Sequence, residues 1–180
     1  QGPTGATGVQ GPQGATGATG ATGPSFQYKQ IVWVDPNGDD VAAAAGNQGD
    51  MILPFKTVKG AFDYLATNSL TGWTIEVQAG VYLEKGTLQV GASNTNVTLH
   101  LSGGVSIQDD PNESVKKLFQ IEGSAKLTIV GDAPDEGYQS YNQNGPLGGA
   151  SIVANDVEEN IFEFTGNATS QNLSISNCSI

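Results

Sequence analysis

The sequence predicts a chain in two parts, a triple-helical stalk over residues 1–25 and an all-β head over residues 26–180. Three observations support this prediction. Glycine occupies every third position from Gly2 to Gly23, short β-branched and aromatic runs fill most of the remainder, and a single segment has helical periodicity. The head, of about 155 residues, fits one domain.

The stalk consists of eight consecutive Gly-X-Y triplets. Only glycine fits at the crowded axis where three polyproline-II chains wind together, so the period of three is a packing requirement. A flexible Gly/Ala/Thr linker is the alternative, but it has no reason to keep glycine in register. We therefore expect a homotrimer held through the glycines of the stalk, which are Gly2, Gly5, Gly8, Gly11, Gly14, Gly17, Gly20 and Gly23.

The stalk is expected to be weak by itself, because its Y positions hold Thr, Gln and Ser and none of its triplets carries a charge. Gln1 fits the Y place of a preceding triplet, so a longer stalk is expected upstream. The last residues, 174–180, have the character of a strand, and we expect the head to be truncated there.

Charge excludes several classes of partner. The chain has 18 acidic residues and 7 basic residues, all lysine, for a net charge of −11. This disfavours binding to nucleic acid and to anionic membranes. No apolar run is long enough for membrane insertion, and one cysteine allows no intrachain disulfide. We expect no cofactor and no metal.

The head opens with a strand over residues 30–35, bounded by Asp-Pro-Asn-Gly. A loop of small residues over 39–50 follows. A helix is then expected to begin at Pro54, because apolar residues recur at helical spacing over 55–66 while Lys56, Lys59 and Asp63 take the other face.

The rest of the head is expected to consist of short strands between turns. These strands can be grouped in threes, as in a solenoid whose coils stack parallel strands. A sandwich of antiparallel strands would give a similar list. The expected strands are 73–78, 81–84, 87–90, 96–101, 105–108, 117–122, 126–130, 150–154, 160–165 and 172–176.

A resemblance separates the two architectures. The chain reads Val34-Asp-Pro-Asn-Gly-Asp-Asp, then Pro54-Phe-Lys-Thr, then Ile75-Glu-Val-Gln-Ala-Gly-Val-Tyr-Leu-Glu84. Over residues 31–131 this resembles the opening of pectin-lyase-like proteins. The resemblance implies a right-handed parallel β-helix capped by one helix, the amphipathic segment 55–66. The exposed end of a stack of strands needs such a cap.

The stalk resembles the collagen-like proteins of bacteria, spore surfaces, bacteriophages and large DNA viruses, which share its Gly-Ala-Thr and Gly-Pro-Thr triplets. In virions such segments form fibres or spikes. The resemblance implies a virion surface location, with an extracellular or bacterial cell-surface location as the alternative.

We find no catalytic set in the sequence. Polysaccharide lyases and esterases of the resembled family use arginine or lysine with aspartates, and this chain has no arginine. The pair Asp109-Asp110 is better interpreted as the N-cap and first turn of a short helix. His100 alternates with leucines, so it is expected to point outward and alone. The aspartates Asp35, Asp39 and Asp40 are explained by turn chemistry.

One stretch looks like an addition to the scaffold, the polar loop 132–149. Long loops on a rigid scaffold are where contacts with partners tend to lie. Tyrosines among acids and amides suit sugar faces and hydroxyls, so we expect Tyr138, Tyr141, Asp135 and Glu136 to contact a glycan or a neighbouring subunit. A loop without a function is the alternative.

These features predict a structural and adhesive trimeric fibre or spike protein without enzymatic activity, which binds other virion or surface proteins and a glycan receptor. A collagen-like protein of a bacterial cell or spore surface is one alternative. A polysaccharide lyase or hydrolase with its catalytic coils beyond residue 180 is another.

Overall fold

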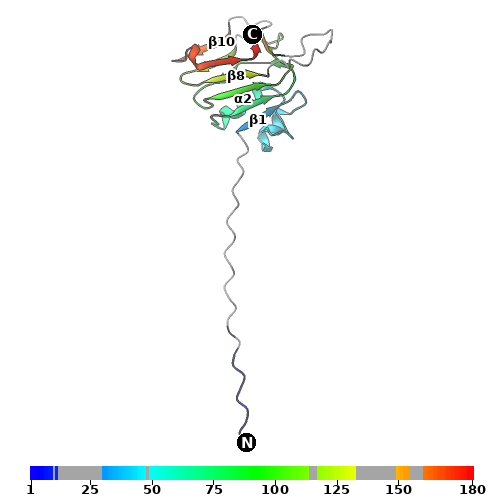
Figure 1. The fold of residues 1–180 in the computed structure, drawn as a ribbon, viewed down its shortest axis with the longest axis vertical. Helices are drawn as coiled ribbons and strands as arrows, with labels where there is room; N and C mark the ends of the chain where they lie inside the picture. The colour runs from blue at the N-terminus through cyan, green and yellow to red at the C-terminus, as the bar shows by residue number, and fades with distance from the viewer. Residues whose placement is uncertain (10, 12–29, 48, 114–116, 133–148, 155–159) are drawn as a thin grey trace.

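A computed structural model shows the fold, and its described residues are 1–9, 11, 30–47, 49–113, 117–132, 149–154 and 160–180. Within them the head contains helices and strands (Figure 1). The helices are α1 (Asp40–Ala42), the π-helix η1 (Ala43–Asn47), α2 (Val58–Thr67) and the 3₁₀-helix η2 (Ser170–Asn172). The strands are β1 (Ile31–Val34), β2 (Thr74–Val77), β3 (Gly80–Glu84), β4 (Leu88–Val90), β5 (Val97–Leu101), β6 (Val105–Asp109), β7 (Lys117–Glu122), β8 (Leu127–Gly131), β9 (Ala150–Val153), β10 (Asn160–Thr165), β11 (Leu173–Ser176) and β12 (Cys178–Ser179).

The strands form three parallel sheets, which the chain visits in rotation. The five-stranded sheet has the order β1-β2-β5-β8-β11, the four-stranded sheet β3-β6-β9-β12, and the three-stranded sheet β4-β7-β10. Each circuit of the chain therefore adds one strand to each sheet, beside the strand from the circuit before. The strands expected from the sequence agree with these to within about a residue at each end, and their grouping in threes agrees with the pairing.

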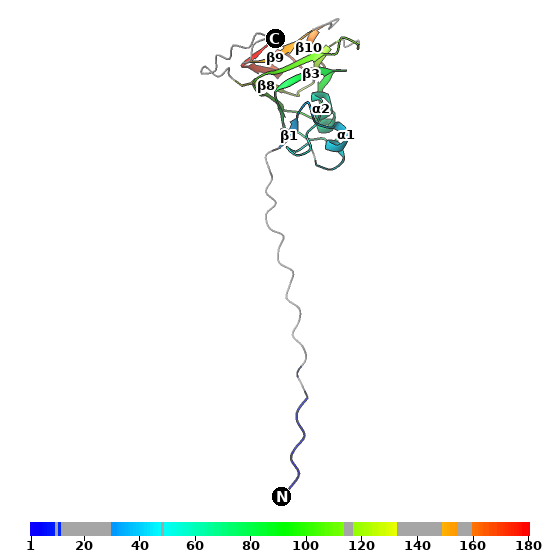
Figure 2. The same cartoon turned by 90° about the vertical axis from the view of Figure 1, so that its right-hand side faces the viewer.

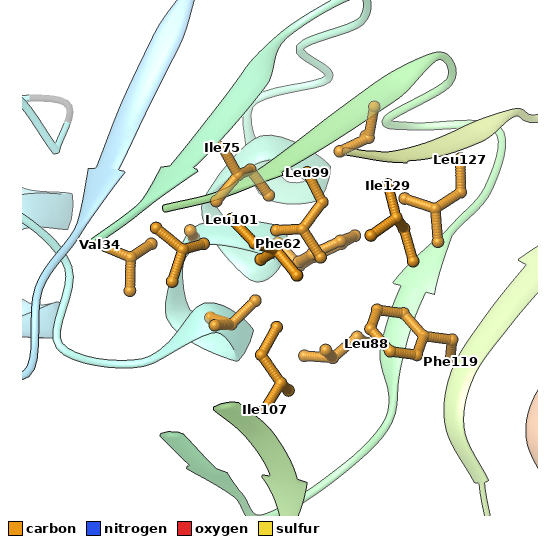
Figure 3. Packing of buried hydrophobic residues seen from close by; sticks show 14 of the residues in the cluster. Val34, Phe62, Ile75, Leu88, Leu99, Leu101, Ile107, Phe119, Leu127 and Ile129 are labelled. Atoms are coloured by element: carbon orange, nitrogen blue, oxygen red, sulfur yellow. The ribbon is translucent and has the colours of Figure 1, made fainter. Parts of the chain in front are cut away.

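The core lies between the sheets and is built from alternate strand residues. In the five-stranded sheet, Val32, Ile75, Leu99 and Ile129 stand side by side on consecutive strands, and all four are fully buried. Figure 3 shows such side chains meeting in the interior, with Ile107 of the four-stranded sheet and Leu88 and Phe119 of the three-stranded sheet. Burial of each large apolar side chain stabilises the head by about 1.5–3 kcal/mol.

Helix α2 packs against this core beside β1, β2 and β4. It buries Val58, Ala61, Phe62 and Leu65, the face that the spacing predicted. The expected start at Pro54 is wrong. The helix begins at Val58, because the Oγ1 atom of Thr57 accepts a hydrogen bond from the Gly60 N–H at 2.9 Å and caps it.

The predicted fold class, an all-β right-handed parallel β-helix capped by one helix, is wrong. The described residues form a mixed α/β fold, with twelve strands in three parallel sheets and helices at several points. The segment expected to be a loop over 39–50 contains α1 and η1. Asp39 caps α1 by accepting from the N–H groups of Val41 and Ala42, and alanines, which are strong helix formers, follow.

The short helix expected after Asp110 would reach residues 114–116, which lie outside the described residues, so it stays a prediction. Up to Glu113, Asp110 organises a turn, in which its carbonyl accepts from Glu113 N–H and its side chain accepts from Asn112 N–H. This local bonding satisfies the same groups that a helix would use, so the sequence signal for the two is the same.

Candidate functional site

The described residues include only some of the predicted site residues. The loop residues Tyr138, Tyr141, Asp135 and Glu136 lie outside the described residues, as do Gly14, Gly17, Gly20 and Gly23 of the stalk. The first four stalk glycines are described.

Residues 1–9 and 11 are exposed and belong to no helix or strand. A Cβ atom built on Gly2, Gly5, Gly8 or Gly11 would meet no other atom within 4 Å. Nothing in the single chain therefore requires glycine at these positions.

Polar and aromatic side chains line the outer face of the five-stranded sheet. The residues Trp33, Glu76 and His100 stand side by side on β1, β2 and β5. Next to them, Thr74, Thr98 and Thr128 form a second row on β2, β5 and β8, which Ser174 of β11 continues. Because strands lie about 4.8 Å apart, each row presents a series of evenly spaced groups to solvent.

His100 lies between two carboxylates on this face. Its Nδ1 atom is 2.8 Å from Oε1 of Glu76, and its Nε2 atom is 3.2 Å from Oδ1 of Asp132. The other oxygen of Asp132 accepts a hydrogen bond from Gly103 N–H at 3.2 Å. The exposed fraction is 31% for His100, 18% for Glu76 and 50% for Asp132, so solvent reaches all three. We define Trp33, Glu76, His100 and Asp132 as the outer-face cluster.

The prediction for His100 was half right. It points outward from the sheet, but it is not alone. Its neighbour Glu76 follows from the strand register. When β2 and β5 pair in parallel with Ile75 beside Leu99, Glu76 comes to lie beside His100. Asp132 follows the end of β8, and sequence reasoning had no signal that its side chain turns back to β5.

A cleft of about 230 Å³ lies beside α2, over the start of the connection from β4 to β5. Most of its polar lining residues already make hydrogen bonds or ion pairs within the head. Lys59 binds Asp63 at 2.7 Å, and Gln89 donates to Glu122 at 3.2 Å. The side chain of Asn94 accepts from Gly91 N–H and donates to the Gln89 carbonyl. A ligand here would have to replace these bonds, so the cleft is a weaker candidate than the outer-face cluster.

Two further carboxylates are structural, because both bind the start of α2. Glu84 is 1% exposed, and its two oxygens accept from the N–H groups of Val58 and Lys59, each at 2.9 Å. Burial raises the pKa of Glu84 to about 7, although these two hydrogen bonds lower it in part. Asp40 accepts from the N–H groups of Lys56 and Thr57 and from the Thr57 hydroxyl.

The remaining predicted aspartates serve turns or lie inside the head. Asp35 accepts from Asn37 N–H at 2.8 Å, as turn chemistry predicted. Asp109 is fully buried, and Asp110 is 6% exposed. Hydrogen bonds from Asn112 hold the pKa of Asp110 below its usual value.

Comparisons with known proteins add no assignment: no family model, no curated protein and no solved structure matches the chain. Among the described residues, no group of three or more His, Cys, Asp or Glu side chains is arranged to hold a metal ion. In that same part of the chain, none of the helices has the length and apolar character needed to cross a membrane.

Proposed function

We propose that this chain is one of three in a structural and adhesive fibre, in which a Gly-X-Y stalk carries heads that display a binding surface. One observation carries the proposal. Glycine occupies every third position over eight triplets, and at the described positions the single chain leaves open space around it. The axis of a triple helix supplies the crowding that the single chain lacks.

The fibre belongs on a virion of a bacteriophage or large DNA virus, attached to other structural proteins. A bacterial cell or spore surface is the alternative setting. The triplets support a collagen-like fibre in either setting, because their Y positions hold Thr, Gln and Ser and never proline, as in the collagen-like proteins that the stalk resembles.

The surface that best suits a receptor is the outer-face cluster, and the receptor class is a glycan. Trp33 is half-buried on this face, and an indole ring suits the apolar face of a sugar. Glu76, His100 and Asp132 offer acceptors and donors for hydroxyl groups. One such site on an open sheet would bind weakly. Three sites on one stalk raise the avidity well above the affinity of one.

The role is binding rather than catalysis. The sequence contains no arginine, which the lyases and esterases of the resembled family use. Asp40 and Glu84 are committed to the start of α2, which leaves them unavailable as an acid–base pair.

The stalk is tested by the substitution Gly8→Ala in the full chain, with Thr7→Ala as the matched control. The two positions are neighbours in adjacent triplets, Thr7 at the end of one and Gly8 at the start of the next, but only Gly8 would face the axis. We expect Gly8→Ala to lower the temperature at which trimers dissociate, measured by circular dichroism and light scattering, and Thr7→Ala to change it little. If the trimers of both variants dissociate at the same temperature, the Gly-X-Y run is a flexible linker and does not form a triple helix.

The binding surface is tested by Trp33→Ala on arrays of immobilised glycans. We expect the apparent affinity to fall by about tenfold or more, since about 1.4 kcal/mol of lost contact corresponds to a factor of ten. The control is Val153→Ala, which removes a partly exposed apolar side chain from β9 of the four-stranded sheet. Binding that survives Trp33→Ala, in a variant with unchanged thermal unfolding, would exclude this face as the receptor site.

A further inference from the structure

Four exposed apolar side chains lie on two neighbouring segments near the first strand of the head. Their exposed fractions are 80% for Val41, 71% for Met51, 83% for Ile52 and 38% for Leu53. We define these four residues as the base patch. Single exposed apolar residues are common, but a consecutive run of three together with a fourth is a feature of surfaces that bind a partner.

Hydrogen bonds fix the position of this patch at one end of the head. β1 is the edge strand of the five-stranded sheet, and residues 49–55 cover its free edge. Trp33 N–H donates to the Gly49 carbonyl at 2.6 Å, and Phe55 N–H donates to the Trp33 carbonyl at 2.8 Å. Residues 51–53 therefore lie beyond the first strand. Figure 1 shows β1 at the end of the head away from the C-terminus, and Figure 2 shows α1 beside it.

Two acidic residues beside the patch, Asp39 and Asp50, direct their carboxylates to nearby backbone N–H groups. Oδ1 of Asp50 accepts from the N–H groups of Ile52 and Leu53, each at 2.9 Å. Oδ1 of Asp39 accepts from Val41 and Ala42, and Asp39 N–H donates to the Pro54 carbonyl, which joins the two segments. Both turns are held in place while the apolar side chains point to solvent.

We infer that the base patch is the contact between heads, and that its occupants are the two other copies of this chain. This inference rests on the proposed trimeric fibre. The triplets end at Ser25 and β1 begins at Ile31, so six residue steps separate them. Six extended steps reach roughly 20 Å at most. A triple helix would thus hold three copies of β1, each with its base patch, close around one axis.

This placement explains why the patch is exposed in one chain. Each head carries these four apolar residues at the end that the stalk would bring closest to its copies. The other exposed apolar side chains of the head's strands, Val81, Leu83 and Val153, lie on β3 and β9 of the four-stranded sheet. It also supplies the trimerising neighbour that a stalk without proline at Y and without ion pairs needs.

The test uses Met51, which is the one methionine of the sequence. Peroxide converts exposed methionine to its sulfoxide, which mass spectrometry of the intact full chain detects. We expect Met51 to oxidise several-fold more slowly in the wild-type trimer than in Gly8→Ala at a temperature where that variant is dissociated. In a chain with an intact stalk, we expect Ile52→Asp to bring the rate back toward that of the dissociated chain, and Val153→Asp, on β9, to leave it unchanged.

The outcomes separate the inference from the proposed function. A trimeric mass with Met51 oxidised as fast as in the dissociated chain overturns the head contact and leaves the fibre standing. The same holds if Ile52→Asp leaves protection intact. A monomeric mass for the wild-type chain overturns both.

Discussion

At the scale of single residues, the buried carboxyl group of Glu84 joins β3 to α2. It lies inside the head and binds the first two N–H groups of the helix, where the helix dipole favours negative charge. Burial outweighs these contacts, so the pKa is raised from 4.5 to about 7. Between about pH 4.5 and 7, the folded head therefore keeps a proton on Glu84 that the unfolded chain has largely released.

This residue predicts a pH dependence of stability. A raised pKa means that the favourable contribution is fully present below about pH 4.5 and is lost as the pH rises through 7. The gap between 4.5 and about 7 corresponds to a loss on the order of 3 kcal/mol. The measurement is urea unfolding of the full chain and of Glu84→Gln from pH 4.5 to pH 8.

Because glutamine does not titrate, the stability of Glu84→Gln relative to the wild type is expected to increase across this range. Other carboxyl groups titrate in both proteins and cancel in the difference. A difference that stays constant with pH would contradict the raised pKa.

The sequence predicted the direction of a side chain correctly where the pattern within a single strand determines it. The alternation of Leu99, His100 and Leu101 was enough to place His100 outward. Its two carboxylate neighbours depend on strand register and on the path of the chain after β8, which alternation within one strand does not contain. The predicted glycan contacts Tyr138 and Tyr141 lie outside the described residues and stay predictions.

At the scale of elements, strands were predicted better than helices. Most of the strands are short runs with β-branched or aromatic residues that end at a turn, and this local pattern suffices for them. The start of α2 was misplaced because Pro54 is a helix-start signal, while the actual cap, Thr57, is held by Asp40 from a distant segment. Helices α1 and η1 were missed because small residues suggest a loop as readily as a helix.

One glycine shows how closely successive circuits pack. Gly131 ends β8, and a Cβ atom there would collide with the backbone carbonyl of Asn177 and lie 3.0 Å from Cβ of Ala150. Gly103 has no atom within 4 Å of such a Cβ and serves as the control. We expect Gly131→Ala to lower the free energy of unfolding by about 1–3 kcal/mol, as overpacking does.

The same change at Gly103 is expected to stay within about 0.5 kcal/mol of the wild type. Both values come from chemical unfolding of the full chain. If the two variants were equally stable, the close approach of the chain at 177 to β8 would be wrong.

At the scale of the whole molecule, the account depends on the number of chains. The head is a mixed α/β unit with its own core, whereas residues 1–9 and 11 are exposed and bond to no sheet. The proposed roles of the three features all require a trimer. The stalk would form a triple helix, the base patch would join the heads, and three copies of the outer-face cluster would raise the avidity.

The most direct test of this account is the solution mass of the intact chain, measured by light scattering after size exclusion below the dissociation temperature. The account predicts three times the chain mass of 18.5 kDa in an elongated particle, falling to one chain on mild heating. A compact particle of one chain mass at every temperature would contradict it, and the Gly-X-Y run would then be a linker.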